Sequence, residues 1–182
     1  MRRCAEHGEA SRPVNVGRLV MTGLFTAMTC VATMVLVVPS PTGGYMNLGD
    51  AIVLLGAFLL GPVYGGLAGG IGAALADLLA GYAMYAPATL GIKILMGLAA
   101  GLLYRCIGKR RKMAGLVVCG VVAESIMVIG YWLYDGFLLG SLAGSAVGIP
   151  ANLVQAAFGI VAATLLTVAL RKTPGFRKFF EA

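Results

Sequence analysis

The residues in this sequence most capable of chemistry are charged and amide side chains inside otherwise apolar stretches. Lys93 and Glu124 each interrupt an apolar run, and Asn152 and Gln155 lie near the start of another. An isolated charge at the centre of a bilayer costs about 2.5 to 3.5 kcal/mol, so intramembrane charges usually face a cavity, a partner or the interface. The chemistry indicated is recognition of a polar solute by ion pairing and hydrogen bonding.

The two charged residues have comparable depths. At 1.5 Å per helical residue, Lys93 lies about 9 Å below Pro87 and Glu124 about 15 Å below Tyr134. Their depths differ by about one helical turn, a distance that a lysine side chain can span. They either form an ion pair that joins two helices or face a cavity and bind a solute. The sequence leaves both interpretations open.

The amides share one helical face. Asn152, Gln155 and Gly159 follow i, i+3, i+7 spacing, so two amides beside a glycine can hydrogen-bond the edge of a heterocycle. The alternative is hydrogen bonding between helices, worth about 0.6 kcal/mol in membranes.

Other polar and aromatic residues have simpler interpretations. Asp50 and Asp77 are predicted to cap helix ends at the interface. Aromatic residues gather at the outer level, as in the belts of membrane proteins. They are Tyr45, Tyr82, Tyr85, Tyr131, Trp132 and Tyr134.

Composition identifies an integral membrane protein. Of 182 residues, 59% are hydrophobic and 12% charged, with a mean hydropathy of +0.91, whereas soluble domains are about a quarter charged. The net charge of +7 does not indicate a nucleic-acid partner, because the basic residues flank apolar spans. The four cysteines form no C-x-x-C pair, the single histidine is His7, and no phosphate-binding loop is present. These observations predict neither a metal site nor a cofactor nor an enzyme.

Six spans are predicted, at residues 19–38, 51–60, 63–79, 88–103, 113–134 and 149–170, all helical and forming one domain over residues 18–172. The second is short, which suggests a tilted, shallow or re-entrant helix. The third carries glycines at small-x-x-x-small spacing, predicted to let helices pack closely: Gly65, Gly66, Gly69, Gly70 and Gly72.

Basic residues predict the orientation. With both termini in the cytoplasm, the tails 1–17 and 173–182 and the loop around residues 105–112 carry the positive charge. The outer loops 39–45, 81–87 and 135–148 have no Lys or Arg. We therefore expect a multi-pass protein of the cell membrane.

Several motifs resemble the substrate-binding S component of energy-coupling factor (ECF) transporters, in the branch that includes riboflavin, hydroxymethylpyrimidine and pyridoxine S components. They cover nearly all of the chain after the first tail. The motifs are GYMNLGD at 44–50, LGP at 60–62, GGIGAALADLLAGY at 69–82, YAPATLGIK at 85–93, AESIMVIGY at 123–131 and IPANLVQ at 149–155.

The resemblance implies a six-helix protein that captures a vitamin or vitamin precursor at an outward-facing site. It also implies three partners, a transmembrane coupling subunit and two cytoplasmic ATPase subunits, which drive release inward. S components of this kind contact the coupling subunit through small residues of the first helix, here Gly23 and Ala27, with Val31 in place of a further alanine.

The expected substrate is a small polar, flat heterocycle, either hydroxymethylpyrimidine or pyridoxine, with riboflavin left open. The alternative function is a stand-alone, ion-coupled secondary transporter, although no repeat relates the two halves of the chain. The candidate substrate-binding residues are Asn47, Tyr85, Lys93, Glu124, Tyr131, Asn152 and Gln155.

Overall fold

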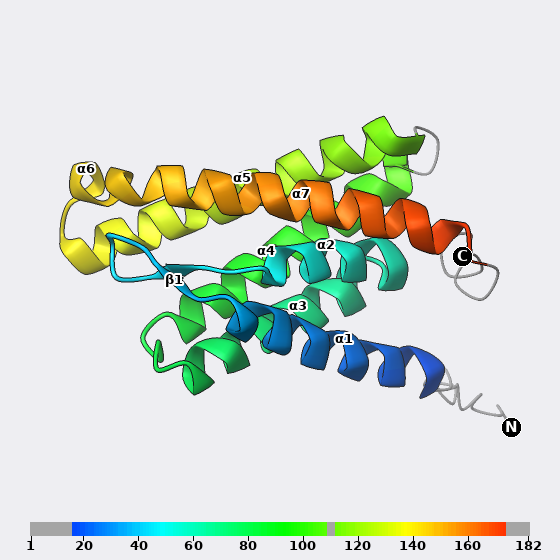
Figure 1. Ribbon diagram of the computed structural model, residues 1–182, viewed down its shortest axis with the longest axis horizontal. Coiled ribbons are helices and arrows are strands. Elements are labelled where there is room, and N and C mark those ends of the chain that lie inside the picture. The colour runs from blue at the N-terminus through cyan, green and yellow to red at the C-terminus, as the bar shows by residue number, and fades with distance from the viewer. Residues whose placement is uncertain (1–15, 109–111, 174–182) are drawn as a thin grey trace, which may run out of the picture.

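The computed structural model describes residues 16–108 and 112–173 as a bundle of helices that run along its long axis (Figure 1). The predicted tails fall outside these ranges, apart from residues 16–17 and 173. Helix α1 begins and helix α7 ends at the same end of the bundle, as an even number of crossings requires (Figure 1).

The elements follow the predicted order with shifted bounds. Five helical segments are long and apolar enough to cross a membrane, and the predicted second span is a shorter apolar helix. In chain order the elements are α1 (Val16–Val35), β1 (Val38–Pro39), β2 (Tyr45–Met46), α2 (Gly49–Leu60), α3 (Pro62–Leu79), α4 (Ala86–Leu103), the π-helix η1 (Tyr104–Gly108), α5 (Lys112–Leu139), α6 (Leu142–Ser145), the 3-10 helix η2 (Ala146–Gly148) and α7 (Ile149–Arg171).

Helix α2 forms the centre of the bundle. Its 12 residues extend about 18 Å, well short of a hydrocarbon core of about 30 Å. Every residue of α2 except Ile52 is buried, and the helix packs against α1, α3, α4 and α7. Because neighbouring helices surround it, α2 does not need the length of a lipid-facing span.

Glycines allow the helices to approach this closely. A Cβ atom at Gly65 of α3 would lie 2.5 Å from Ala57 Cα of α2. A Cβ atom at Gly97 of α4 would lie 2.6 Å from Gly66 Cα of α3. The predicted packing role of the third-span glycines is therefore confirmed.

The outer end is more ordered than the sequence suggested. The predicted loop 39–45 contributes to a short antiparallel hairpin, in which Val38 pairs with Met46 and Pro39 with Tyr45. The prediction that the fifth span ends at residue 134 was wrong, since α5 continues to Leu139 and carries Asp135 on its buried side. Residues 142–148 form α6 and η2, where a loop was predicted.

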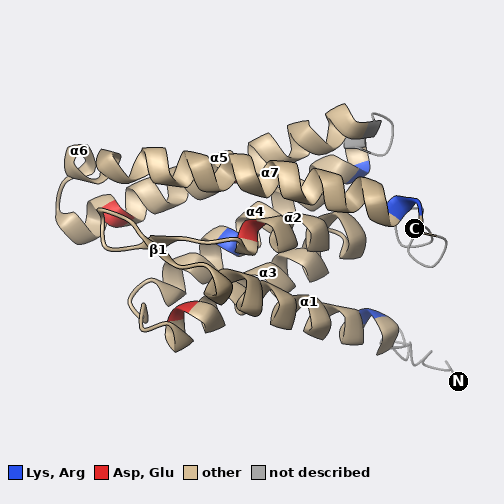
Figure 2. Cartoon of the chain, viewed as in Figure 1, with Lys and Arg blue, Asp and Glu red and all other residues tan. Residues whose placement is uncertain are grey.

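Charge divides the molecule into two ends (Figure 2). Apart from Lys93, the described Lys and Arg residues lie where α1 begins, at η1, where α5 begins and at the end of α7. The described acidic residues lie on α2, α3 and α5: Asp50, Asp77, Glu124 and Asp135. The acidic positions that are visible in Figure 2 lie between the middle of the bundle and its outer end. This distribution agrees with the orientation predicted from the positive-inside rule.

Candidate functional site

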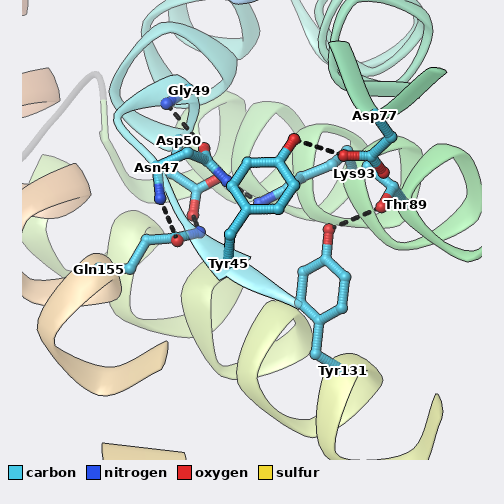
Figure 3. Close-up of polar contacts among 9 residues, drawn as sticks. All are labelled: Tyr45, Asn47, Gly49, Asp50, Asp77, Thr89, Lys93, Tyr131 and Gln155. Atoms are coloured by element: carbon cyan, nitrogen blue, oxygen red, sulfur yellow. Dashed lines mark hydrogen bonds and ion pairs between the residues drawn. The ribbon is translucent and has the colours of Figure 1, made fainter. Parts of the chain in front are cut away.

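A buried carboxylate at the start of α2 is the centre of a polar network (Figure 3). Asp50 Oδ1 forms an ion pair with Lys93 Nζ of α4, and each residue is 1% exposed. Asp50 Oδ2 accepts a hydrogen bond from Gln155 Nε2 of α7 at 2.6 Å. Both carboxylate oxygens thus have a donor, which offsets the cost of burying the charge.

The network continues from α7 to the outer segment that precedes α2. Gln155 Oε1 accepts the backbone N–H of Asn47 at 2.8 Å. Asn47 Oδ1 in turn accepts the backbone N–H of Gly49 at 2.9 Å, which satisfies a free donor at the start of the helix. One buried charge pair therefore connects three helices to the outer loop (Figure 3).

Two tyrosines hold the outer segment to the helices. The hydroxyl of Tyr45 donates to Asp77 Oδ1 of α3 at 2.6 Å. The hydroxyl of Tyr85 lies 3.0 Å from Asp135 Oδ1 and 3.3 Å from the carbonyl oxygen of Thr42. Burial, together with the neighbouring carboxylate, raises the pKa of each phenol above its usual value, so both remain protonated donors.

A third tyrosine borders the ion pair. The hydroxyl of Tyr131 on α5 lies 3.0 Å from Thr89 Oγ1 of α4. Lys93 Nζ lies 5.5 Å from the centre of the Tyr131 ring, within the range of a cation–π contact. The aromatic face is therefore directed toward the ammonium group (Figure 3).

These groups enclose a small cavity of about 30 Å³ near the outer end of the bundle. Hydroxyl, amide, carboxylate and ammonium groups from the hairpin segment and from α1, α3, α4, α5 and α7 line it. Its polar and aromatic lining consists of Thr33, Ser40, Thr42, Tyr45, Asn47, Asp77, Tyr85, Thr89, Lys93, Tyr131, Asp135 and Asn152.

The structure brings most of the predicted site residues together. Five of the seven line the cavity, namely Asn47, Tyr85, Lys93, Tyr131 and Asn152. Gln155 does not line it, but it positions Asp50 and the Asn47 backbone from behind.

Glu124 occupies a different position. It is 2% exposed and borders a second cavity of about 340 Å³ between α5 and α7, walled mainly by apolar side chains. A Cβ atom at Gly159 would lie 2.5 Å from Glu124 Oε1 and 3.0 Å from Asp50 Cβ, so the Glu124 carboxyl group lies beside Asp50. The ion pair considered between Lys93 and Glu124 is replaced by one between Lys93 and Asp50, because α2 inserts Asp50 between the other helices.

Sequence reasoning missed three acidic residues of the site. Asp50 and Asp77 were predicted to cap helix ends at the interface, yet they are 1% and 3% exposed and accept hydrogen bonds from other elements. Asp135 was assigned to a loop, although it is 3% exposed on α5. The shortness of the second span was the available signal, because a short central helix places its first residues deep in the bundle.

Within residues 16–108 and 112–173, no group of three or more His, Cys, Asp or Glu side chains is placed to hold a metal ion. The polar groups of the site suit hydrogen bonding and ion pairing with a solute.

Solved structures share this fold. The S component for biotin from an ECF-type ABC transporter aligns with a TM-score of 0.63 and 18% identity, covering 93% of this chain and all of that one. The S component of a bacterial ECF transporter aligns with a TM-score of 0.61 and 22% identity, covering 90% and 98% of the two chains.

Two relatives are similar in sequence. A protein of Lactococcus lactis subsp. cremoris described as the thiamine precursor transporter HmpT is 32% identical over 170 residues, covering 90% of this chain and 95% of the relative. An uncharacterized protein of Pyrococcus woesei is 37% identical over 147 residues, covering 80% and 95%.

A family model settles the classification. The model described as "ECF-type riboflavin transporter, S component" matches residues 14–172. ECF S components are integral proteins of the cytoplasmic membrane that bind vitamins and pair with an ECF module, and theirs is a transporter family, not an enzyme family. The chain therefore belongs to the ECF-type riboflavin transporter S component family, as the substrate-binding membrane subunit of a transporter for a vitamin-like substrate.

Proposed function

We propose that the outer cavity binds a small, flat vitamin precursor and that a hydroxymethylpyrimidine-like molecule is the substrate. The observation that carries this proposal is the convergence of Lys93, Asn152 and three tyrosines on one cavity. Tyrosine rings can stack on a flat heterocycle, while the amide and ammonium groups can bond its edge.

The size of the cavity favours a single ring over a larger ring system. At about 30 Å³ the cavity has to expand for any heterocycle, and a one-ring ligand requires the smallest opening. Hydrogen bonds from Tyr85 to Thr42 and from Asn47 to Gln155 hold the hairpin segment against the helices. Outward movement of that segment would enlarge the site. The similarity to a relative described as a thiamine precursor transporter supports the same choice.

We assign different roles to the candidate residues. Lys93 and Asn152 bond the edge of the substrate, and Tyr85 and Tyr131 contact its faces. Asn47 belongs to the outer segment and lines the cavity, so a bound substrate would contact that segment through Asn47. Gln155 and Glu124 flank Asp50 and act from behind the cavity wall: Gln155 through its hydrogen bond to Asp50, and Glu124 through its position beside that carboxylate.

The first helix supplies the proposed contact with the partner module, a coupling subunit that acts with two ATPase subunits. Gly23 and Ala27 are exposed on the outer face of α1, and a Cβ atom at Gly23 would meet nothing within 4 Å. Larger exposed apolar residues on the same helix border them, including Leu19, Leu24 and Val31. Small residues among large ones permit close helix approach in a bilayer, which supports docking of a transmembrane helix here.

Calorimetric titration of the purified chain tests the substrate. The ligands are 4-amino-5-hydroxymethyl-2-methylpyrimidine, pyridoxine and riboflavin, each added without ATP. We expect the pyrimidine to bind most tightly. Replacing Asn152 or Tyr131 by alanine should weaken binding at least about tenfold, equivalent to about 1.4 kcal/mol.

Ser125→Ala is the matched control, because Ser125 is exposed on α5 and its hydroxyl donates to Val121 O of the same helix at 2.8 Å. If riboflavin binds tightly and the other two ligands do not, the substrate is riboflavin and the proposed pyrimidine is wrong. Unchanged affinity in both alanine variants would contradict the site. Uptake into liposomes by this chain alone would contradict the dependence on partner subunits.

A further inference from the structure

The outer cavity has an excess of negative charge. Asp77 and Asp135 line it directly, and Asp50 lies behind it in the ion pair with Lys93. Within residues 16–108 and 112–173, Lys93 is the only basic residue that lines it. In Figure 2 the visible acidic positions lie between the middle of the bundle and its outer end, and the basic positions lie at the opposite end, apart from one at the middle.

Asp50 balances the charge of the Lys93 ammonium group, whose other N–H groups can still donate to an acceptor on the edge of a substrate. The ammonium group forms its ion pair with Asp50 and lies over the ring of Tyr131. Asp77 and Asp135 are each 3% exposed, and each accepts a hydrogen bond from a tyrosine hydroxyl: Tyr45 at 2.6 Å for Asp77 and Tyr85 at 3.0 Å for Asp135. Neutral donors bond a carboxylate without cancelling its charge.

Buried carboxylates of this kind favour a positive charge nearby. Burying an ionised carboxylate without a counter-ion is costly, and a cation placed between two of them gains from both. The two aspartates come from different helices, α3 and α5, on the wall of the same cavity. A ligand in that cavity therefore lies within the field of both.

Aromatic rings add to this preference. The rings of Tyr45 and Tyr82 have centroids 4.4 Å apart, and Tyr85 follows with its centroid 6.5 Å from that of Tyr82. The ring of Tyr134 lies 5.5 Å from that of Tyr85. Of these four rings, Tyr45 and Tyr85 line the cavity, and Tyr82 and Tyr134 pack against them. Faces of tyrosine rings attract cations, more strongly where water is excluded.

We infer that the cavity takes its substrate as an organic cation: a nitrogen heterocycle that is protonated or permanently charged, held between Asp77 and Asp135 and against the tyrosine rings. This inference rests on the proposed function and specifies the charge of its substrate. A basic ring nitrogen, as in an aminopyrimidine, meets the requirement. A phosphate ester of the same heterocycle does not, because its negative charge faces the two carboxylates.

Two probes of equal shape separate charge from size. One is 1-methyl-3-(hydroxymethyl)pyridinium, a permanent cation, and the other is 3-methylbenzyl alcohol, its neutral isostere. Calorimetric titration of the full-length protein should show the cation binding at least about tenfold more tightly, a difference of about 1.4 kcal/mol. The variants D77N and D135N should each remove most of this preference, because asparagine keeps an acceptor for the tyrosine hydroxyl and loses the charge.

The neutral isostere, titrated against the same variants, is the matched control. If D77N unfolds the protein, as judged by size exclusion and circular dichroism, D135N alone still tests the inference, because it lies on another helix. Equal affinities of the two probes, in a protein that binds the vitamin precursor, would overturn the charge assignment and leave the proposed function intact. If added sodium makes the neutral alcohol bind more tightly, the positive charge between the aspartates comes from a metal ion and not from the substrate. That result would also overturn the charge assignment. Failure of every heterocycle to bind would refute the proposed function itself.

Discussion

The ion pair between Lys93 and Asp50 allows a quantitative test of how the outer half of the bundle is stabilised. The variant Lys93→Met keeps the apolar length of the side chain and removes its charge. Asp50 then stays buried and keeps the hydrogen bond from Gln155 without its counter-ion. Breaking a buried pair from one side costs about 3 to 5 kcal/mol, because the other charge stays uncompensated. For a chain of this size, at about 2 to 4 °C per kcal/mol, the unfolding midpoint should fall by roughly 6 to 20 °C.

The assay is thermal unfolding of the purified protein in detergent, followed by circular dichroism. The double variant Asp50→Asn with Lys93→Met should recover much of the loss, because both charges are then absent and Gln155 keeps a partner. Lys172→Met is the control, since Lys172 is exposed at the cytoplasmic end and should change stability by no more than about 0.5 kcal/mol. A loss below about 1 kcal/mol for Lys93→Met, or a double variant as unstable as the sum of the singles, would refute this reasoning.

Three further predictions concern other parts of the molecule. Tyr85→Phe removes the hydroxyl donor to buried Asp135 and should cost about 1 to 3 kcal/mol, measured as a lower unfolding midpoint. Gly97→Ala places a Cβ atom 2.6 Å from Gly66 Cα and should destabilise the chain by about 1 to 3 kcal/mol. The control is Gly91→Ala on the same helix, where the added Cβ atom meets nothing within 4 Å and should not lower stability. Ala27→Trp on the exposed face of α1 should leave stability and substrate binding unchanged. It should lower ATP-driven uptake by the reconstituted transporter about tenfold, as expected if about 1.4 kcal/mol of contact with the coupling subunit is lost. Undiminished uptake would contradict docking at this face.

The fold could be predicted from the sequence to the extent that local patterns determine it. Apolar length and the positions of basic residues predicted the number of spans and the orientation, because these depend on the bilayer and not on how the helices pack. Small-residue spacing likewise predicted the close contact of α3 with its neighbours, confirmed at Gly65 and Gly66.

The partners within the site could not be predicted in the same way. Counting residues along each helix gave the depths of Lys93 and Glu124 but could not show that α2 inserts Asp50 between them. The end of α5 was also missed, since no proline interrupts the chain around Asp135 and the helix continues. The hairpin that covers the cavity has two-residue strands, too short for an alternating pattern.

The position of α2 has a mechanical consequence for the whole molecule. Its first turn carries Asp50, and its last turn leads to Gly61, where a Cβ atom would lie 2.5 Å from Arg105 Nη2 of the cytoplasmic π-helix. The backbones of Ala57 on α2 and Gly65 on α3 are in close contact, so α2 cannot shift along its axis without disturbing α3. A shift of Asp50 along the axis of α2 would therefore also have to move Ala57 against Gly65 and Gly61 against Arg105, so the two ends of this short helix belong to one tightly packed unit.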